Sequence, residues 1–287
     1  MRQPMSLRDA VAEFVRDGGI VALEGTSHLV PFAAAHELIR QGRKDLTLVR
    51  LAPDLILDQL VGMGCASRLV FGWGGSPGLA RLHRLRDALR EGWPLTPAAE
   101  QLRPTDLAAA YQAGAMKLPF GVLCGYGGAA AVPRTSRIRP LRCPFTGDEL
   151  AVVRALRPDV AFLHAQEADR SGNVLFWGDL GVQKAAALAS RRTIVTVEEI
   201  VDDLCAWPNA YQLPGGSLAA VCVVPGGAHP SPVLGHYERD RGFYRAWDGI
   251  ARQRDAFGAW MERHVLATVD FDAFRRVLDS SRSRSQG

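Results

Sequence analysis

Segments with a helical repeat of apolar residues alternate with short apolar runs in the first part of the chain. The helical repeat occurs at residues 6–18 and 31–42, and the apolar runs occur at residues 20–25 and 46–51. Successive runs lie ~25 residues apart, which is too long for hairpins and suits right-handed units of strand, helix and parallel strand. The alternation therefore predicts an α/β fold with a mainly parallel sheet flanked by helices.

The same alternation continues through most of the chain. Further helices are expected at residues 53–64, 77–92 and 105–117, and further strands at 67–72, 120–124, 159–165, 192–199 and 219–224. Residues 133–149 are rich in Arg and Pro and are expected to leave the sheet as an irregular excursion.

Beyond residue 232 the pattern is helical only, over residues 238–266 and 271–280. We therefore expect an α/β body over residues 1–235 and a C-terminal helical arm of the same domain over residues 236–279. The remaining residues, 280–287, read SSRSRSQG and are expected to form a disordered tail.

Composition excludes several classes of protein. A chain of 287 residues, 47% of them hydrophobic, can bury a full core without disulfides or metals. The five cysteines show no CxxC spacing, so no disulfide framework, zinc site or other metal is indicated. No apolar run reaches about 18 residues and the N-terminus lacks a signal-peptide pattern, which predicts a cytoplasmic protein without a membrane partner. The net charge of +4 comes from dispersed arginines, so no nucleic-acid partner is expected.

Glycines recur just beyond several predicted strands. The stretches are Gly25-Thr26-Ser27-His28, residues 73–78 with Gly74, Gly75 and Ser76, residues 125–128 with Gly125, Gly127 and Gly128, and residues 225–230. Carboxyl ends of parallel strands meet at one edge of a sheet, where ligands usually bind. The glycines serve either tight turns or the approach of backbone N–H groups to an oxyanion or phosphate, and the sequence leaves both open. Neither a P-loop nor a dinucleotide-binding fingerprint is present.

Ser76 is a candidate nucleophile because Gly74-Gly75-Ser76-Pro77-Gly78 has the spacing of a nucleophile elbow. However, an elbow takes half of its oxyanion hole from the backbone N–H after the nucleophile, and Pro77 has none. The favoured interpretation is a helix N-cap, with Pro77 at the first helical position. A capping serine can also offer its hydroxyl to a ligand.

Other candidates are His164 after one predicted strand, His229 in the last glycine-rich stretch, and the pair Glu198-Glu199 at the end of a strand. A lone histidine at a strand end is more often a hydrogen-bonded structural residue than a base. The glutamates are either catalytic carboxylates or the acidic start of a helix over residues 200–204. Core or interface positions are expected for Trp73, Trp177 and Trp207. These residues do not form a complete catalytic set.

Six stretches together resemble one known family. They read SLRDAVAEFVRDGGIVALEG, PFAAAHELIRQGRKDLTLV, AYQAGAMKLPF, DVAFLHAQEADRSGNVLFWG, TIVTVEEIVDD and VVPGGAHPSPVLGHYERD. The chain resembles the α (A) subunit of family I coenzyme A transferases, closest to the glutaconate CoA-transferase type, from residue 5 to residue 265. The last two stretches are the most specific.

This resemblance implies a heteromeric enzyme whose partner β subunit supplies the nucleophilic glutamate. That glutamate attacks an acyl-CoA, forms a mixed anhydride and becomes a glutamyl-CoA thioester, so coenzyme A is a substrate thioester and a carboxylic acid is the acceptor. By the same resemblance Ser76 is presented to the active site to position substrate and support the oxyanion. Substrate-binding positions would be Gly25, Thr26, Gly74, Gly75, Gly125, Gly127 and Gly128. A bare loop lets the thioester carbonyl lie against backbone N–H groups.

The chain departs from the family pattern at Glu24-Gly25-Thr26, where Gly-Gly-Phe is common. Some relatives instead hydrolyse the last ring of steroid-degradation intermediates held as CoA thioesters. That subgroup has an acidic residue before the helix leading to LPF and an arginine after LPF, positions held here by Pro104 and Cys124. The alternatives are therefore a subunit of such a ring-opening hydrolase and a non-catalytic acyl-CoA binding protein that needs no partner.

Overall fold

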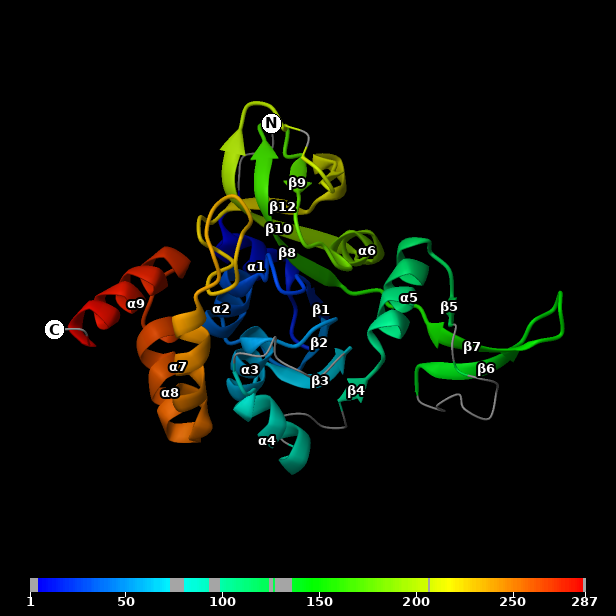
Figure 1. Ribbon diagram of the computed structural model, residues 1–287, viewed down its shortest axis with the longest axis horizontal. Coiled ribbons are helices and arrows are strands. Elements are labelled where there is room, and N and C mark those ends of the chain that lie inside the picture. Colours follow the sequence, from blue (N-terminus) through cyan, green and yellow to red (C-terminus); the bar gives the residue numbers. More distant parts are fainter. Residues whose placement is uncertain are drawn as a thin grey trace.

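A nine-stranded, mostly parallel sheet forms the centre of the described chain (Figure 1). The computed structural model describes residues 5–72, 80–92, 99–123, 126, 136–205 and 207–285. Parallel strands are β1 (Ile20–Leu23), β2 (Leu46–Arg50), β3 (Ala66–Phe71), β4 (Glu100–Gln101), β8 (Val160–Asp169), β10 (Arg192–Val201) and β12 (Ala220–Val223). Two strands run antiparallel, β9 (Val174–Phe176) and β11 (Tyr211–Leu213). The predicted α/β fold with a mainly parallel sheet is confirmed.

Strand β8 is the hub of this sheet. One edge of β8 pairs first with β1 and then, further along, with the antiparallel β9. The other edge pairs with β10 along its whole length. The end of β1 therefore lies beside the first part of β8, before β9 pairs with the same edge.

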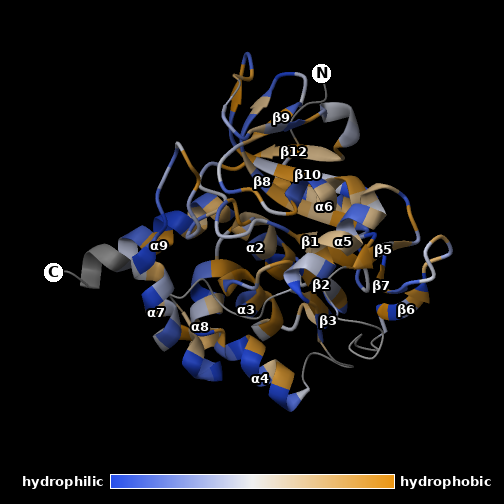
Figure 2. Ribbon diagram, turned by 45° about the vertical axis from the view of Figure 1, so that its right-hand side comes forward, coloured by the Kyte–Doolittle hydropathy of each residue, from blue (hydrophilic) through white to orange (hydrophobic). Residues whose placement is uncertain are grey.

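Helices cover both faces of the sheet because alternate side chains of its strands point to opposite sides. Paired Val21 and Leu48 belong to one core, which is covered by α1 (Leu7–Phe14), α2 (Phe32–Arg40), α3 (Leu55–Gly62) and α4 (His83–Glu91). The next pair, Ala22 and Val49, belongs to a second core, which is covered by α5 (Pro104–Ala115) and α6 (Gln183–Ala189). In Figure 2 the strands are mainly hydrophobic and the helices are two-toned, as this burial requires.

A separate antiparallel sheet projects beside α5. Its strands are β5 (Phe120–Leu123), β6 (Ile138–Arg142) and β7 (Glu149–Arg154), in the order β5-β7-β6. Two predictions were wrong here. Residues 120–123 do not join the parallel sheet, because β5 pairs with β7, and the Arg/Pro-rich stretch is not irregular throughout, because β6 lies within it.

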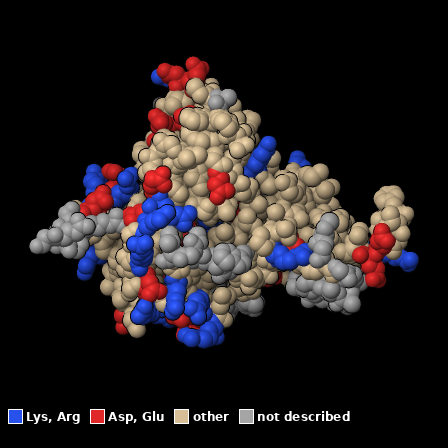
Figure 3. All heavy atoms as spheres, viewed as in Figure 1, with Lys and Arg blue, Asp and Glu red and all other residues tan. Residues whose placement is uncertain are grey.

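The C-terminal helices pack on the α2–α3 side of the body. They are α7 (Arg241–Arg252), α8 (Arg254–Met261), a π-helical turn (Glu262–Leu266) and α9 (Phe271–Ser285). Trp247 is fully buried, and its indole nitrogen donates to Asp58 Oδ2 of α3 at 2.8 Å. Charged side chains of both signs crowd over α4 and these helices, while the middle of the same face is largely uncharged (Figure 3).

The end of the chain differs from the predicted loose tail. Helix α9 continues to Ser285, and the Ser280 hydroxyl donates to the Arg276 carbonyl within it. Leu278 is buried one turn after Phe274, so the helix is anchored close to its end. Among the described residues no helix is both long enough and apolar enough to cross a bilayer.

Candidate active site

Two of the predicted substrate-binding residues, Gly25 and Thr26, lie at the end of β1. The others fall outside the described residues and stay predictions: Ser76, Gly74, Gly75, Gly125, Gly127 and Gly128, together with Trp73. One associated interpretation was wrong. Helix α4 begins at His83 with Leu82 as its N-cap, and residues 80–82 are not helical, so Ser76 does not cap it.

Gly25 must be glycine for a local structural reason. A Cβ added here would lie 2.3 Å from the carbonyl oxygen of Leu29, and its φ of +154° is rare for other residues. The chain therefore turns back so tightly that residues 25–29 form a compact loop. The buried Arg50 guanidinium donates to the carbonyls of Leu23 and Gly25, which fixes the entry to this loop.

Thr26 packs against the chain that follows β9. A Cβ added at Gly181 would lie 2.2 Å from Thr26 Oγ1, so only glycine leaves room for this hydroxyl. Next to it, the Ser27 hydroxyl donates to Asp179 Oδ2 at 2.7 Å, and Arg239 donates to the Ser27 carbonyl at 2.6 Å. The loop is thus held on two sides by side chains from distant parts of the sequence.

Glu24, directly before the loop, is a buried carboxyl group that sequence reasoning treated only as a departure from a family pattern. Its Oε1 accepts from the Tyr111 hydroxyl at 2.7 Å, and both oxygens lie 3.1 Å from the Leu51 backbone nitrogen. Burial raises the pKa of Glu24 to about 7, and the charge of Arg50 and these hydrogen bonds offset this only in part. In the sequence, the one indication of this buried carboxyl group was a charged residue at the end of an apolar strand.

This pKa predicts a pH dependence of stability. The unfolded chain loses the Glu24 proton near the ordinary glutamate pKa of 4.5, whereas the folded chain keeps it to about 7. The stabilisation that protonated Glu24 gives the folded chain is fully present below pH 4.5 and is lost as the pH rises through 7. Its loss between pH 5 and 8 lowers the free energy of unfolding by about 2.5 kcal/mol.

Urea unfolding of the wild type and Glu24→Gln at several pH values measures this effect. The fall with pH is expected to be smaller in Glu24→Gln by that amount, because glutamine does not titrate. The exposed Glu199→Gln is the control and should follow the wild type. An equal fall of the free energy of unfolding with pH in the wild type and in Glu24→Gln would contradict the raised pKa of Glu24.

Tyr126 is the one described residue of the glycine-rich loop 124–128, and it anchors that loop to α5. Its hydroxyl donates to Asp106 in the first turn of α5, and Arg103 lies 3.6 Å from its ring centroid. Burial and the Asp106 carboxylate raise the pKa of Tyr126 to about 12. Tyr111, five residues further along α5, holds Glu24, and five helical residues span about 7.5 Å. Helix α5 therefore holds both Tyr126 and Glu24, although β5 does not reach the main sheet.

Tyr126→Phe is expected to lower the free energy of unfolding by about 1.5–2 kcal/mol, because it removes a hydrogen bond to a charged carboxylate. Denaturant titration measures the change. Tyr211→Phe is a matched control. The Tyr211 hydroxyl is buried and has no hydrogen-bond partner in the described part of the chain, so its removal should be neutral or stabilising. Equal losses in both variants would contradict this role of Tyr126.

His164 and Glu198 form a buried polar network between β8 and β10. His164 Nε2 lies 2.7 Å from Glu198 Oε1, and its Nδ1 lies 2.8 Å from Thr196 Oγ1. Glu198 also accepts from the Gly226 backbone N–H at 2.7 Å and from the Tyr237 hydroxyl at 2.8 Å. Burial alone would raise the pKa of Glu198, but these hydrogen bonds and the His164 charge hold it below its ordinary value.

The predicted helix over residues 200–204 was wrong, because β10 continues to Val201. Glu199 is exposed, so the two adjacent glutamates occupy different environments. His229 is likewise hydrogen-bonded, with its Nε2 2.8 Å from Asp240 Oδ2. Trp177 is buried and stacks on Trp207 with ring centroids 5.2 Å apart, in agreement with a core position for Trp177.

The glycine-rich stretch 225–234 positions the loop after β1. Its Gly227 carbonyl accepts from the Ala33 N–H at the start of α2, and its Pro232 carbonyl accepts from the Leu29 N–H. The Leu234 N–H donates to His28 Nε2 at 2.7 Å. Because Glu198 holds the Gly226 N–H, the buried network and the loop containing Gly25 belong to one connected arrangement.

Comparison with known proteins places this arrangement in a family. The family model described as Coenzyme A transferase matches residues 4–223, which is most of the chain. The chain belongs to the coenzyme A transferase family. The family membership predicted from the sequence motifs is thereby confirmed.

Similar proteins align with this coenzyme A transferase chain along almost its whole length. It is 56% identical over 278 residues to the A subunit of 3-oxoadipate CoA-transferase from Pseudomonas knackmussii, covering 97% of this chain and 99% of that protein. It is 30% identical to the A subunit of glutaconate CoA-transferase from Acidaminococcus fermentans, covering 98% and 93%.

The solved structure of glutaconate coenzyme A-transferase from Acidaminococcus fermentans matches with a TM-score of 0.86 and 29% identity, covering 97% of this chain and 93% of that one. The resemblance therefore includes both the sheet and the C-terminal helices of this coenzyme A transferase chain.

Proposed function

We propose that this chain is the α subunit of a heteromeric CoA-transferase whose nucleophilic glutamate belongs to a partner β subunit. One observation supports this most strongly. The two buried glutamates at this edge of the sheet, Glu24 and Glu198, are both engaged by hydrogen bonds from within the chain. Their hydrogen bonds hold both in structural contacts, which supports a reacting carboxylate supplied by another molecule.

The proposed role of this chain is to position the substrate and stabilise charge. The loop of Gly25 and Thr26 lies where β1 ends, with Gly25 buried and Thr26 half-buried. The loops with Gly74, Gly75 and Ser76 and with Gly125, Gly127 and Gly128 are proposed to complete the same wall. Backbone N–H groups and the Ser76 hydroxyl would stabilise the oxyanion of each tetrahedral intermediate.

The proposed transfer balances without a metal or redox group. The partner's glutamate oxygen bonds to the thioester carbonyl carbon, and the carbon–sulfur bond breaks to give a mixed anhydride and CoA thiolate. The thiolate then attacks the glutamyl carbonyl and releases the donor acid. The acceptor carboxylate attacks the resulting glutamyl-CoA and expels the thiolate, which gives a second mixed anhydride. The thiolate then attacks the acceptor's acyl carbon and releases the glutamate carboxylate.

We propose a short dicarboxylic acid of the 3-oxoadipate kind as acceptor, because the relative with 56% identity is named for that acid. The test purifies this chain together with its co-expressed β partner and measures CoA transfer from succinyl-CoA to 3-oxoadipate. Transfer is expected only when both chains are present. Equal transfer by this chain alone would contradict the proposal, and thioester hydrolysis without transfer would favour the ring-opening hydrolase alternative.

A further inference from the structure

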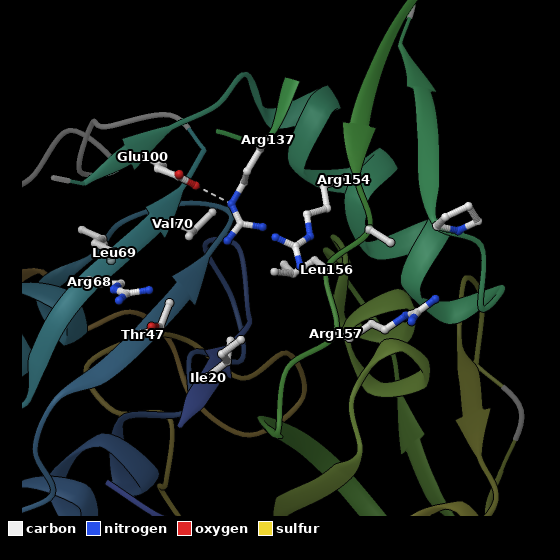
Figure 4. Close-up of a pocket in the computed structure, with 12 residues that line it drawn as sticks. Ile20, Thr47, Arg68, Leu69, Val70, Glu100, Arg137, Arg154, Leu156 and Arg157 are labelled. Carbon is white, nitrogen blue, oxygen red and sulfur yellow. Dashed lines mark hydrogen bonds and ion pairs between the residues drawn. The ribbon is translucent and has the colours of Figure 1, made fainter. Parts of the chain in front are cut away.

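A cavity of about 720 Å³ lies on the α5 side of the sheet, away from the loop of Gly25. Its floor includes Ile20, the first residue of β1, and Thr47, near the start of β2, whereas Gly25 follows the opposite end of β1. Its other side is formed where the chain leaves β7, at Arg154 and Leu156 (Figure 4). The cavity therefore lies between the two sheets and is separate from the candidate active site.

Three guanidinium groups point into this space. In Figure 4 the guanidinium groups of Arg137, from the turn before β6, and Arg154, from β7, lie beside each other, and Arg68 from β3 lies across the space from them. A single carboxylate of the lining, Glu100, is already paired with Arg137. Within the described ranges, Arg68 and Arg154 have no side-chain hydrogen bond or ion pair. The lining thus carries two positive charges that no described carboxylate neutralises.

Arg157 lines the same cavity but behaves differently. Its guanidinium points away from the other three in Figure 4 and donates to the carbonyls of Lys117 and Leu118 at 3.2 and 3.1 Å. Arg157 carries the same charge as Arg68 and Arg154 and lines the same cavity, but its guanidinium group does not point into it. Arg157 therefore serves as a matched control residue.

The surroundings of the two cations are partly apolar. Buried Val70 and Leu156 and the half-buried Ile20 form apolar walls, while Arg68 and Arg154 are exposed to water. Their attraction for an anion is therefore screened by salt. An anion that enters gains from both cations. The planar guanidinium fork matches the oxygen geometry of carboxylate and phosphate. A phosphate group offers about two negative charges and three acceptor oxygens at one centre, which suits several converging guanidiniums better than a single carboxylate does.

We propose that this cavity is a binding site for the phosphate group of a small molecule, held mainly by Arg68 and Arg154 with Arg137 as a third donor. Thr47, which is buried, is the one uncharged polar residue among the described lining residues. The assignment does not rest on the proposed transferase activity, because the site lies at the other end of β1.

Isothermal titration calorimetry of the full-length chain with inorganic pyrophosphate tests the proposal. One saturable site is expected, with affinity that falls as salt is added. The double variant Arg68→Ala/Arg154→Ala should bind at least about tenfold more weakly, whereas Arg157→Ala should bind within about twofold of the wild type. Absence of saturable binding, or an equal loss in Arg157→Ala, would overturn the proposal.

A second measurement needs no variant. Pyrophosphate should slow phenylglyoxal modification of Arg68 and Arg154 and leave that of Arg157 unchanged, as read by peptide mass spectrometry. Equal rates with and without pyrophosphate would count against the site. Adenosine 3′,5′-bisphosphate binding more tightly than pyrophosphate would identify a nucleotide as the source of the phosphate, and the reverse order would identify a free phosphate compound.

Two further outcomes would also overturn it. Succinate binding as tightly as pyrophosphate would show that carboxylates suffice. Loss of pyrophosphate binding on addition of the purified β partner would show that these arginines serve subunit docking instead.

Discussion

Glu198→Ala is expected to lower the free energy of unfolding by about 3–5 kcal/mol, because it removes the common acceptor of a buried network. His164 Nε2, the Gly226 N–H and the Tyr237 hydroxyl would all lose their partner in a region closed to water. Denaturant titration with circular dichroism detection measures the loss.

The neighbouring Glu199→Ala is the matched control. Glu199 is exposed and lies in the same strand, so its removal should change stability by no more than about 0.5 kcal/mol. A loss below about 1 kcal/mol in Glu198→Ala would mean that the network does not hold the 225–234 stretch in place.

Gly25→Ala is expected to reduce CoA transfer by the complex about 100-fold. The added Cβ would lie 2.3 Å from the Leu29 carbonyl oxygen, so the loop must move by roughly 1 Å to reach an ordinary contact. Misplacement of about 1 Å in a positioning group costs on the order of 100-fold in rate. Steady-state kinetics of the co-purified complex measure this effect.

Gly249→Ala provides the control for that substitution. Gly249 lies in α7, and a Cβ added there meets no atom within 4 Å. Its activity should therefore equal that of the wild type. Unchanged transfer by Gly25→Ala would show that the loop after β1 takes no part in the reaction.

The alternation of helices and strands was enough to predict the central sheet, because apolar runs at this spacing can be buried only between helices. It could not predict where β5 pairs, since an isolated strand carries no information about its neighbour. Strand β6 was missed because Pro140 reads as a strand breaker. An edge strand tolerates proline, and β6 is the edge of its sheet.

The loop after β1 could be predicted from the sequence, but its contacts could not. Glycine after an apolar strand indicated the loop at Gly25. The partnership of His164 with Glu198 was invisible, because 34 residues separate them in the chain and only the register of β8 against β10 brings them together. The helix predicted over residues 271–280 continues to Ser285, and its last residues were not predicted as helical because their serines and arginines carry no apolar repeat.

The location of the covalent intermediate tests the central claim most directly. The co-purified complex is incubated with acyl-CoA, reduced with borohydride and digested, and mass spectrometry then identifies the modified glutamate. We predict that the modified glutamate lies on the β partner, while the α chain stays unmodified. Modification of Glu24, Glu198 or any other residue of this chain would contradict the claim that it supplies the binding wall and its partner supplies the nucleophile.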